Sequence, residues 1–198
     1  MKVNPSPTSQ PTELSKPIKT SLEAELFDGS SVSIELLGID DLAEVFHLGE
    51  QLFTSDSSPM LYRTWDAYEV TGAFQTDPDT CFVARDDKGN LIGFVLGTII
   101  EKETAWTYGY VTWLGVHPYW QRCQIGERLM AALEHRMAMD GVRMFLVDTS
   151  ADNQSAIRFF DKLGYGSREE HLYLWKTLRG DAEARQRKTR ERSEELEP

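Results

Sequence analysis

The segment Leu114–Met130 has the residue pattern of a strand that passes through a short polar loop into an amphipathic helix. The apolar run ends at His117-Pro118, and Gln121, Arg122 and Gly126 lie around the expected start of the helix. The first N–H groups of a helix have no partner within the helix, and the helix dipole places partial positive charge at the same end. These donors suit a phosphate group, and Arg122 adds a cation with bidentate geometry. The spacing therefore predicts a pyrophosphate-binding loop.

This loop also carries a family resemblance. Gln121–Gly126, which reads Gln-Arg-Cys-Gln-Ile-Gly, resembles the Q/R-x-x-G-x-G/A signature of the GCN5-related N-acetyltransferases (GNAT), in which the loop surrounds the pyrophosphate of acetyl-CoA. A second segment, Asp152–Tyr165, is similar to the family pattern N-x-x-A-x-x-x-Y-x-K-x-G-F. The overall pattern is most similar to the branch that acetylates protein N-termini, including the ribosomal-protein alanine acetyltransferases. The resemblance implies an acetyl-CoA-dependent N-acetyltransferase.

The resemblance also implies which residues bind acetyl-CoA. Backbone groups of Leu114 and Val116 would bind pantetheine, and Asn153 would bond to the pantetheine or amine region. The pyrophosphate would be bound by a run of loop residues, namely Gln121, Arg122, Cys123, Gln124, Ile125, Gly126 and Glu127.

Two residues depart from the family pattern. Gln124 stands where the family usually has glycine, so we expect it either to take an ordinary φ or to turn its amide away from the phosphate. Phe160 stands where the family commonly has a tyrosine that protonates the CoA thiolate, and phenylalanine has no proton to donate. Water or another hydroxyl would then supply this proton, or the chain would bind acetyl-CoA without transferring the acetyl group.

Two residues are candidates for the catalytic base, and neither excludes the other. Tyr110 stands in a strand that resembles that of eukaryotic-type N-terminal acetyltransferases, where a tyrosine acts through water. By two-residue alternation, Tyr108 and Thr112 share its face. Asp148 ends an apolar strand five residues before Asn153, where that branch has Glu or His. Either group would remove a proton from the acceptor ammonium, and the structural alternatives are a strand tyrosine and a capping or ion-paired aspartate.

The order of apolar patterns predicts an α/β fold with a mixed central sheet. This is also the element order of the family, so the resemblance implies the GNAT fold, with about six to seven strands and four flanking helices. Expected strands are Ser31–Leu36, Cys81–Arg85, Leu91–Leu96, Trp106–Val116, Met144–Asp148 and Leu172–Trp175. Expected helices begin near Asp40, Thr64, Ile125 and Asp152. We expect a disordered arm over residues 1–20, an acetyltransferase domain over 21–178 and a charged tail over 179–198.

Composition limits the classes of partner. The chain has 198 residues and a formal net charge of −11, which disfavours nucleic-acid binding and suits cationic acceptors. No apolar run has the length of a membrane span, and no secretory signal is evident. The four histidines and two cysteines show no metal-ligand spacing. A cytoplasmic protein, monomeric or homodimeric, is the simplest expectation.

The sequence is compatible with three interpretations of the acceptor and of the function. A peptide N-terminus or lysine is favoured by the strand that carries Tyr110. A small amine such as a polyamine or antibiotic is the second. The third is a regulatory module that binds acyl-CoA with little catalysis, which Phe160 and Gln124 favour. In the family, acceptor grooves come from the segments that correspond to 54–63 and 167–171.

Overall fold

The computed structural model describes residues 24–25, 31–54, 64–101, 106–169, 172 and 174. The chain forms two compact units, Met1–Asn153 and Gln154–Pro198. The predicted arm 1–20 and tail 179–198 lie outside the described residues. Of the predicted final strand, Leu172 and Leu174 are described and neither lies in a strand.

The first unit is built on one mixed sheet with the strand order β1-β2-β3-β4-β5-β6. The strands are β1 (Ala24–Glu25), β2 (Ser31–Leu36), β3 (Cys81–Arg85), β4 (Leu91–Ile100), β5 (Tyr108–Val116) and β6 (Met144–Val147). Neighbours from β1 to β5 are antiparallel, and β5 and β6 are parallel. Among the described residues the sheet thus has five strands of ordinary length beside the two-residue β1, against the six to seven predicted.

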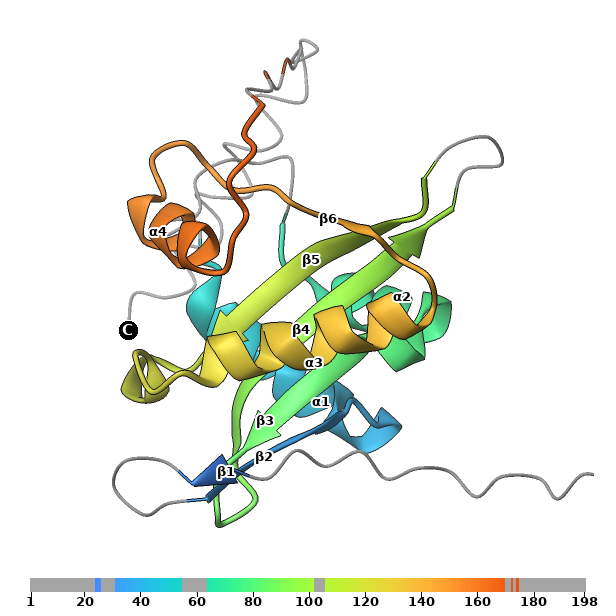
Figure 1. Cartoon of the computed structure of the whole chain (residues 1–198). Helices are drawn as coiled ribbons and strands as arrows, with labels where there is room; N and C mark the ends of the chain where they lie inside the picture. Colours follow the sequence, from blue (N-terminus) through green and yellow to red (C-terminus); the bar gives the residue numbers. More distant parts are fainter. Residues whose placement is uncertain are drawn as a thin grey trace, which may run out of the picture. The chain divides into compact units, whose positions relative to one another are not determined.

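Three helices cover the two faces of this sheet (Figure 1). They are α1 (Leu42–Leu52), α2 (Ala67–Thr76) and α3 (Ile125–Met139). Figure 1 shows α3 on one face and α1 and α2 on the other. With α4 (Gln154–Lys162) in the second unit, the four predicted helices are confirmed. Since both faces are covered, β3 and β4 are apolar along most of their length instead of alternating.

Close packing of α3 depends on glycines in the strands beneath it. A Cβ on Gly97 would lie 2.7 Å from Met137 and 2.9 Å from Leu133, both of which are fully buried. Full burial of one such side chain contributes about 1.5–3 kcal/mol. The α3 axis is therefore fixed close to the sheet, which fixes the position of its first turn as well.

The other face has an aromatic-rich core beneath α1 and α2. Its buried members are Leu37, Val45, Leu48, Trp65, Val70, Cys81, Val83, Phe94 and Leu96. Trp65 also donates its indole N–H to the carbonyl of Phe46, 2.9 Å away. Complete burial raises the pKa of the Cys81 thiol to about 11, so this cysteine is a core residue and not a nucleophile.

The second unit has a small apolar cluster of its own. Phe160 of α4 is 9% exposed and packs edge to face on Tyr165, with ring centroids 5.4 Å apart. Gly164 follows the end of the helix at φ +95°. Glycine is common at this position because it adopts a positive φ without strain. The phenylalanine that replaces the family's tyrosine thus contributes to the packing of this unit.

Candidate active site

A β-bulge divides strand β5 into two halves. Leu96 of β4 pairs with Trp113, whereas the next residue, Gly97, pairs with Val111, so Thr112 is the extra residue. The Thr112 hydroxyl donates to the Leu96 carbonyl at 2.8 Å. A bulge bends the strand and redirects the side chains beyond it.

The bulge changes which residues of β5 face α1 and α2. A Cβ on Gly109 would meet Met137 of α3, whereas a Cβ on Gly115 would meet Leu52 of α1. Without the bulge these two glycines would face the same side, because side chains alternate with a period of two. Tyr110 therefore faces the α1/α2 side before the bulge, and Trp113 faces that side after it. The alternation that was predicted to give Tyr110 and Thr112 a common face is interrupted at Thr112.

The two predicted catalytic side chains meet on this face. The phenol of Tyr110 donates a hydrogen bond to Oδ1 of Asp148. Tyr110 pairs with Leu146 of β6, and Asp148 lies two residues further along, directly after that strand. Both side chains are half-buried, so neither is closed off completely from solvent.

The pair stands where β5 and β6 stop pairing. Their register runs from Tyr108↔Met144 to Val111↔Val147. β6 then ends, whereas β5 continues to Val116 (Figure 1). Beyond the bulge, the edge of β5 away from β4 is therefore not paired with β6.

Leu114 and Val116 present their backbone groups to this edge. The N–H of His117 donates to the Ile92 carbonyl of β4 at 2.9 Å, so by alternation the N–H and C=O of Leu114 and Val116 point away from β4. The Gln121 amide supports this geometry, because it reaches the Val116 carbonyl at 3.3 Å. An unpaired strand edge of this kind can bind an extended chain of amides.

The loop after β5 has an unusual backbone. Arg122 has φ 65° and Gln124 has φ 62°, in the left-handed region that glycine favours. Of the two alternatives expected for Gln124, an ordinary φ is therefore excluded, and a side-chain amide turned away from the phosphate stays a prediction. The left-handed conformation costs a residue with a side chain roughly 1–2 kcal/mol. Residues held in such conformations cluster at ligand sites, because successive N–H groups there form a concave anion site.

The first turn of α3 completes the loop. Gln124, the N-cap, makes no side-chain capping bond. Its carbonyl accepts from Arg128 N–H at 3.1 Å, so the amides of Ile125, Gly126 and Glu127 precede the hydrogen bonds of the helix. Ile125 is 1% exposed and anchors this turn in the core. The loop thus offers N–H groups and the Arg122 guanidinium on a rigid base.

Other predicted residues stand near the loop or at the end of the first unit. Cys123 is half-buried, with its Sγ 3.8 Å from the Gln121 carbonyl. Asn153 is the last residue of the first unit, and its N–H donates to the Ser150 carbonyl at 2.9 Å. A role in cofactor binding stays a prediction for both.

One carboxylate on this face was not predicted. The indole N–H of Trp113 donates to Oε2 of Glu69, in the first turn of α2, at 2.5 Å. The Trp113 ring also packs on Phe53 and Trp65, with centroids 4.6 and 5.1 Å apart. The sequence shows only separate tryptophans, because the residues that bring them together are far apart in the chain.

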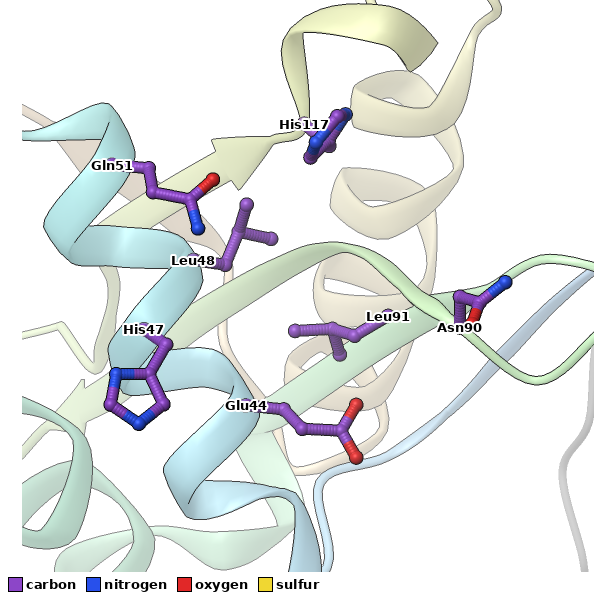
Figure 2. Close-up of a pocket in the computed structure, with 7 residues that line it drawn as sticks. All are labelled: Glu44, His47, Leu48, Gln51, Asn90, Leu91 and His117. Carbon is purple, nitrogen blue, oxygen red and sulfur yellow. The ribbon is translucent and has the colours of Figure 1, made fainter.

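A shallow pocket of about 300 Å³ lies beside α1. Figure 2 shows Leu48 and Leu91 in its middle, with His117 at one end and Glu44 at the other. His117 links the pocket to the loop, since its Nδ1 accepts from Tyr119 N–H at 3.3 Å. The pocket does not include Tyr110 or Asp148.

The described residues contain no group of three or more His, Cys, Asp or Glu side chains that could hold a metal ion. Within the same residues, no helix has both the length and the apolarity needed to cross a membrane.

The model of the acetyltransferase (GNAT) family matches residues 42–165. The chain belongs to this family. It is therefore an acetyltransferase that uses acetyl-CoA, as the resemblance of Gln121–Gly126 and Asp152–Tyr165 implied. The match spans α1 through α4 and includes every predicted site residue.

Named relatives support the assignment. The chain is 28% identical to acetyltransferase SG1711 of Sodalis glossinidius (strain morsitans) over 154 residues, which are 77% of this chain and 99% of that protein. It is 29% identical to NAA20, the catalytic subunit of the N-terminal acetyltransferase B complex of Arabidopsis thaliana, over 57% of this chain and 65% of that protein.

The fold is also similar to that of the aminoglycoside N-acetyltransferase AAC(6')-Iy, solved in complex with CoA. The TM-score is 0.60 at 21% identity, over 76% of this chain and 97% of the other. This likeness confirms the GNAT fold.

Proposed function

We propose that the protein transfers the acetyl group of acetyl-CoA directly to a primary amine in a ternary complex, with a peptide N-terminus or lysine as the favoured acceptor. The observation that carries the proposal is the hydrogen bond between Tyr110 and Asp148. It lies on the α1/α2 side of the sheet, at the point where β5 and β6 stop pairing.

Acetyl-CoA is held along the edge of β5 and the loop. The first-turn amides of α3 and Arg122 bind its pyrophosphate, and the backbone of Leu114 and Val116 binds pantetheine. A main-chain N–H at this edge also stabilises the oxygen of the thioester carbonyl as charge develops on it. The bound molecule supplies an activated acetyl group.

The side chains of Asp148 and Tyr110 carry out the proton transfers of the reaction. An amine arrives largely as ammonium and must lose a proton before its nitrogen lone pair can attack. The Asp148 carboxylate takes this proton, directly or through one water, while Tyr110 orients it. The new N–C bond then forms as the C–S bond breaks. The Tyr110 hydroxyl protonates the departing thiolate, a role for which Phe160 has no hydroxyl. After the attack the nitrogen still carries one surplus proton, and the Tyr110 phenolate takes it. The products are then the amide, the CoA thiol and one proton on Asp148.

A peptide acceptor is favoured over a small amine. NAA20, named as a catalytic subunit for N-terminal acetylation, is similar over residues that include more than half of this chain. An aminoglycoside acceptor is the alternative, because an aminoglycoside N-acetyltransferase shares the fold.

A peptide-library acetylation screen read by mass spectrometry tests the proposal. We expect acetyl transfer to peptide α-amines or lysines. Asp148→Asn and Tyr110→Phe should each lower kcat by about 100-fold, the lower end of the usual effect of losing a general acid or base. Because the two side chains act as one unit, the double variant should lose little more than the worse single variant.

Binding of acetyl-CoA is the control. Both variants should retain the wild-type Kd for acetyl-CoA by calorimetry, because neither side chain belongs to the pyrophosphate loop. Wild-type kcat in both variants would refute the assignment of the pair. Transfer to aminoglycosides and to no peptide would favour the alternative acceptor.

A further inference from the structure

Glu69 is a carboxylate held over the same face of β5 as the Tyr110–Asp148 pair. Its only hydrogen bond among the described residues comes from the neutral indole N–H of Trp113. Within the described part of the chain, no cationic side chain pairs with it. One neutral donor does not compensate the full negative charge of a half-buried carboxylate.

The neighbouring carboxylate on α2 shows what a purely structural role looks like. Asp66 is the N-cap, and its Oδ1 accepts from the N–H groups of Tyr68 at 2.8 Å and Glu69 at 3.2 Å. These bonds satisfy the helix end. The Glu69 side chain takes no part in capping and reaches across to the sheet instead.

Glu69 lies within reach of an acceptor bound at the pair. Tyr110 and Trp113 face the same side on either side of the bulge, and three strand residues span at most about 10 Å. That distance corresponds to two or three residues of an extended peptide. An acceptor whose amino group meets Asp148 can therefore place its second or third side chain at Glu69.

The surroundings suit a cation. The Trp113 indole that donates to the Glu69 carboxylate packs on Phe53 and Trp65, so the carboxylate lies at the edge of an aromatic cluster. A carboxylate beside aromatic rings is the combination that binds ammonium and guanidinium groups. The formal net charge of −11 also attracts cationic acceptors at long range.

We propose that Glu69, oriented by Trp113, selects acceptor peptides that carry a lysine or arginine at the second or third position. This inference rests on the proposed function, because it assumes that the acceptor amine binds at Asp148. Glu69 acts on binding of the acceptor and takes no part in the proton transfers.

Steady-state kinetics with three peptides tests the proposal. The peptides are identical except for Lys, Gln or Glu at the second position. We expect Glu69→Gln, which keeps an acceptor for the Trp113 N–H, to raise KM for the Lys peptide about tenfold with unchanged kcat. The KM for the Gln peptide should not change. Glu69→Lys should reverse the order of preference and favour the Glu peptide.

Asp140→Asn is the matched control. It removes one negative charge from the end of α3, on the opposite face of the sheet, where Asp140 pairs with Arg136 at 3.1 Å. It should leave the KM of all three peptides unchanged, which excludes a simple effect of net charge.

The possible results separate the inference from the proposed function. A wild-type protein that acetylates no peptide overturns both. An active wild type whose Glu69→Gln variant changes all three peptides alike, or none of them, overturns the inference and leaves the proposed function intact. A merely structural Glu69 would lower Tm and affect the three peptides equally.

Discussion

Two loops of this protein contain residues with positive φ, but they place different residue types there. They are the β3–β4 turn at residues 86–90 and the β5–α3 loop at residues 117–124. In the turn, the positive φ falls on Gly89, at +81°. The Asp86 carboxylate accepts from the N–H groups of Lys88 and Asn90, at 3.0 and 2.8 Å. The turn thus places its one unusual φ on glycine and satisfies its own donors.

The β5–α3 loop differs in the second half of its backbone. His117 accepts from the N–H groups of Tyr119 and Trp120, but no glycine stands at the positive φ values further on. Arg122 and Gln124 carry the positive φ values, and the Gln124 side chain does not cap α3. Such strain persists only where the surrounding structure enforces it, and it is typical of ligand sites. The difference indicates that the turn is built for stability and the loop for a ligand. The predictions below test this contrast, beginning with the largest effect.

Reversing one charge in each loop should give the largest difference between them, measured as the Kd for acetyl-CoA. Arg122→Glu removes a cation from the pyrophosphate site and places an anion there, so we expect the Kd for acetyl-CoA to rise more than 100-fold, about 3 kcal/mol. Calorimetric titration measures this change. Lys88→Glu makes the same change in net charge at the turn and should leave Kd unaltered. Equal losses in both variants would contradict a local role for Arg122.

Truncating the Asp86 side chain should affect stability alone. Burial opposes its charge, but hydrogen bonds from Asn90 and Lys88 outweigh this and lower the pKa of the Asp86 carboxyl. Asp86→Ala should therefore cost about 1–2 kcal/mol of the free energy of unfolding at neutral pH. Denaturant unfolding measures this cost.

The stability contributed by the Asp86 carboxylate should depend on pH in a defined direction. A lowered native pKa stabilises the fold above the unfolded value of about 4, and the stabilisation is lost as the pH falls through the native pKa. The difference in stability between wild type and Asp86→Ala should therefore shrink below about pH 4. A difference that grows there would contradict the hydrogen-bonding account.

Placing glycine in the β5–α3 loop and removing it from the β3–β4 turn should change the free energy of unfolding slightly, with opposite signs. Gln124→Gly relieves a left-handed backbone and should add up to about 1 kcal/mol of stability. Gly89→Ala should remove about 1 kcal/mol through backbone strain alone, since no atom lies within 4 Å of the added Cβ. Both are read from denaturant unfolding. A loss of stability in Gln124→Gly would show that its side chain stabilises the loop.

The sequence predicted the elements whose pattern is local. A short segment is enough to show the periodicity of the amphipathic helix that became α3, and the same holds for the residue pattern of the loop from Gln121 to Gly126. The family resemblance rested on such segments, and the family match confirmed it.

Contacts between distant segments were not predictable in this way. Tyr110 and Asp148 were proposed as separate candidates, and their hydrogen bond joins residues 38 positions apart. It depends on the register of β5 and β6, which no local pattern specifies. The bulge at Thr112 and the contact of Glu69 with Trp113 depend on pairing and packing of the same kind.

The left-handed backbone at Gln124 shows a different limit. The sequence left two alternatives for Gln124, an ordinary φ or a side-chain amide turned away, because side chains disfavour the left-handed region. The anchored start of α3 overrides that local preference. The excluded alternative concerns the loop proposed to bind the ligand, where backbone strain is expected.

An NMR titration of the ¹⁵N-labelled protein with acetyl-CoA tests the contrast between the two loops most directly. We expect large shifts at the amides of Ile125, Gly126 and Glu127, smaller shifts at Leu114 and Val116, and none from Lys88 to Asn90. Saturable binding that leaves the α3 amides unchanged, or that shifts the β3–β4 turn instead, would contradict the account.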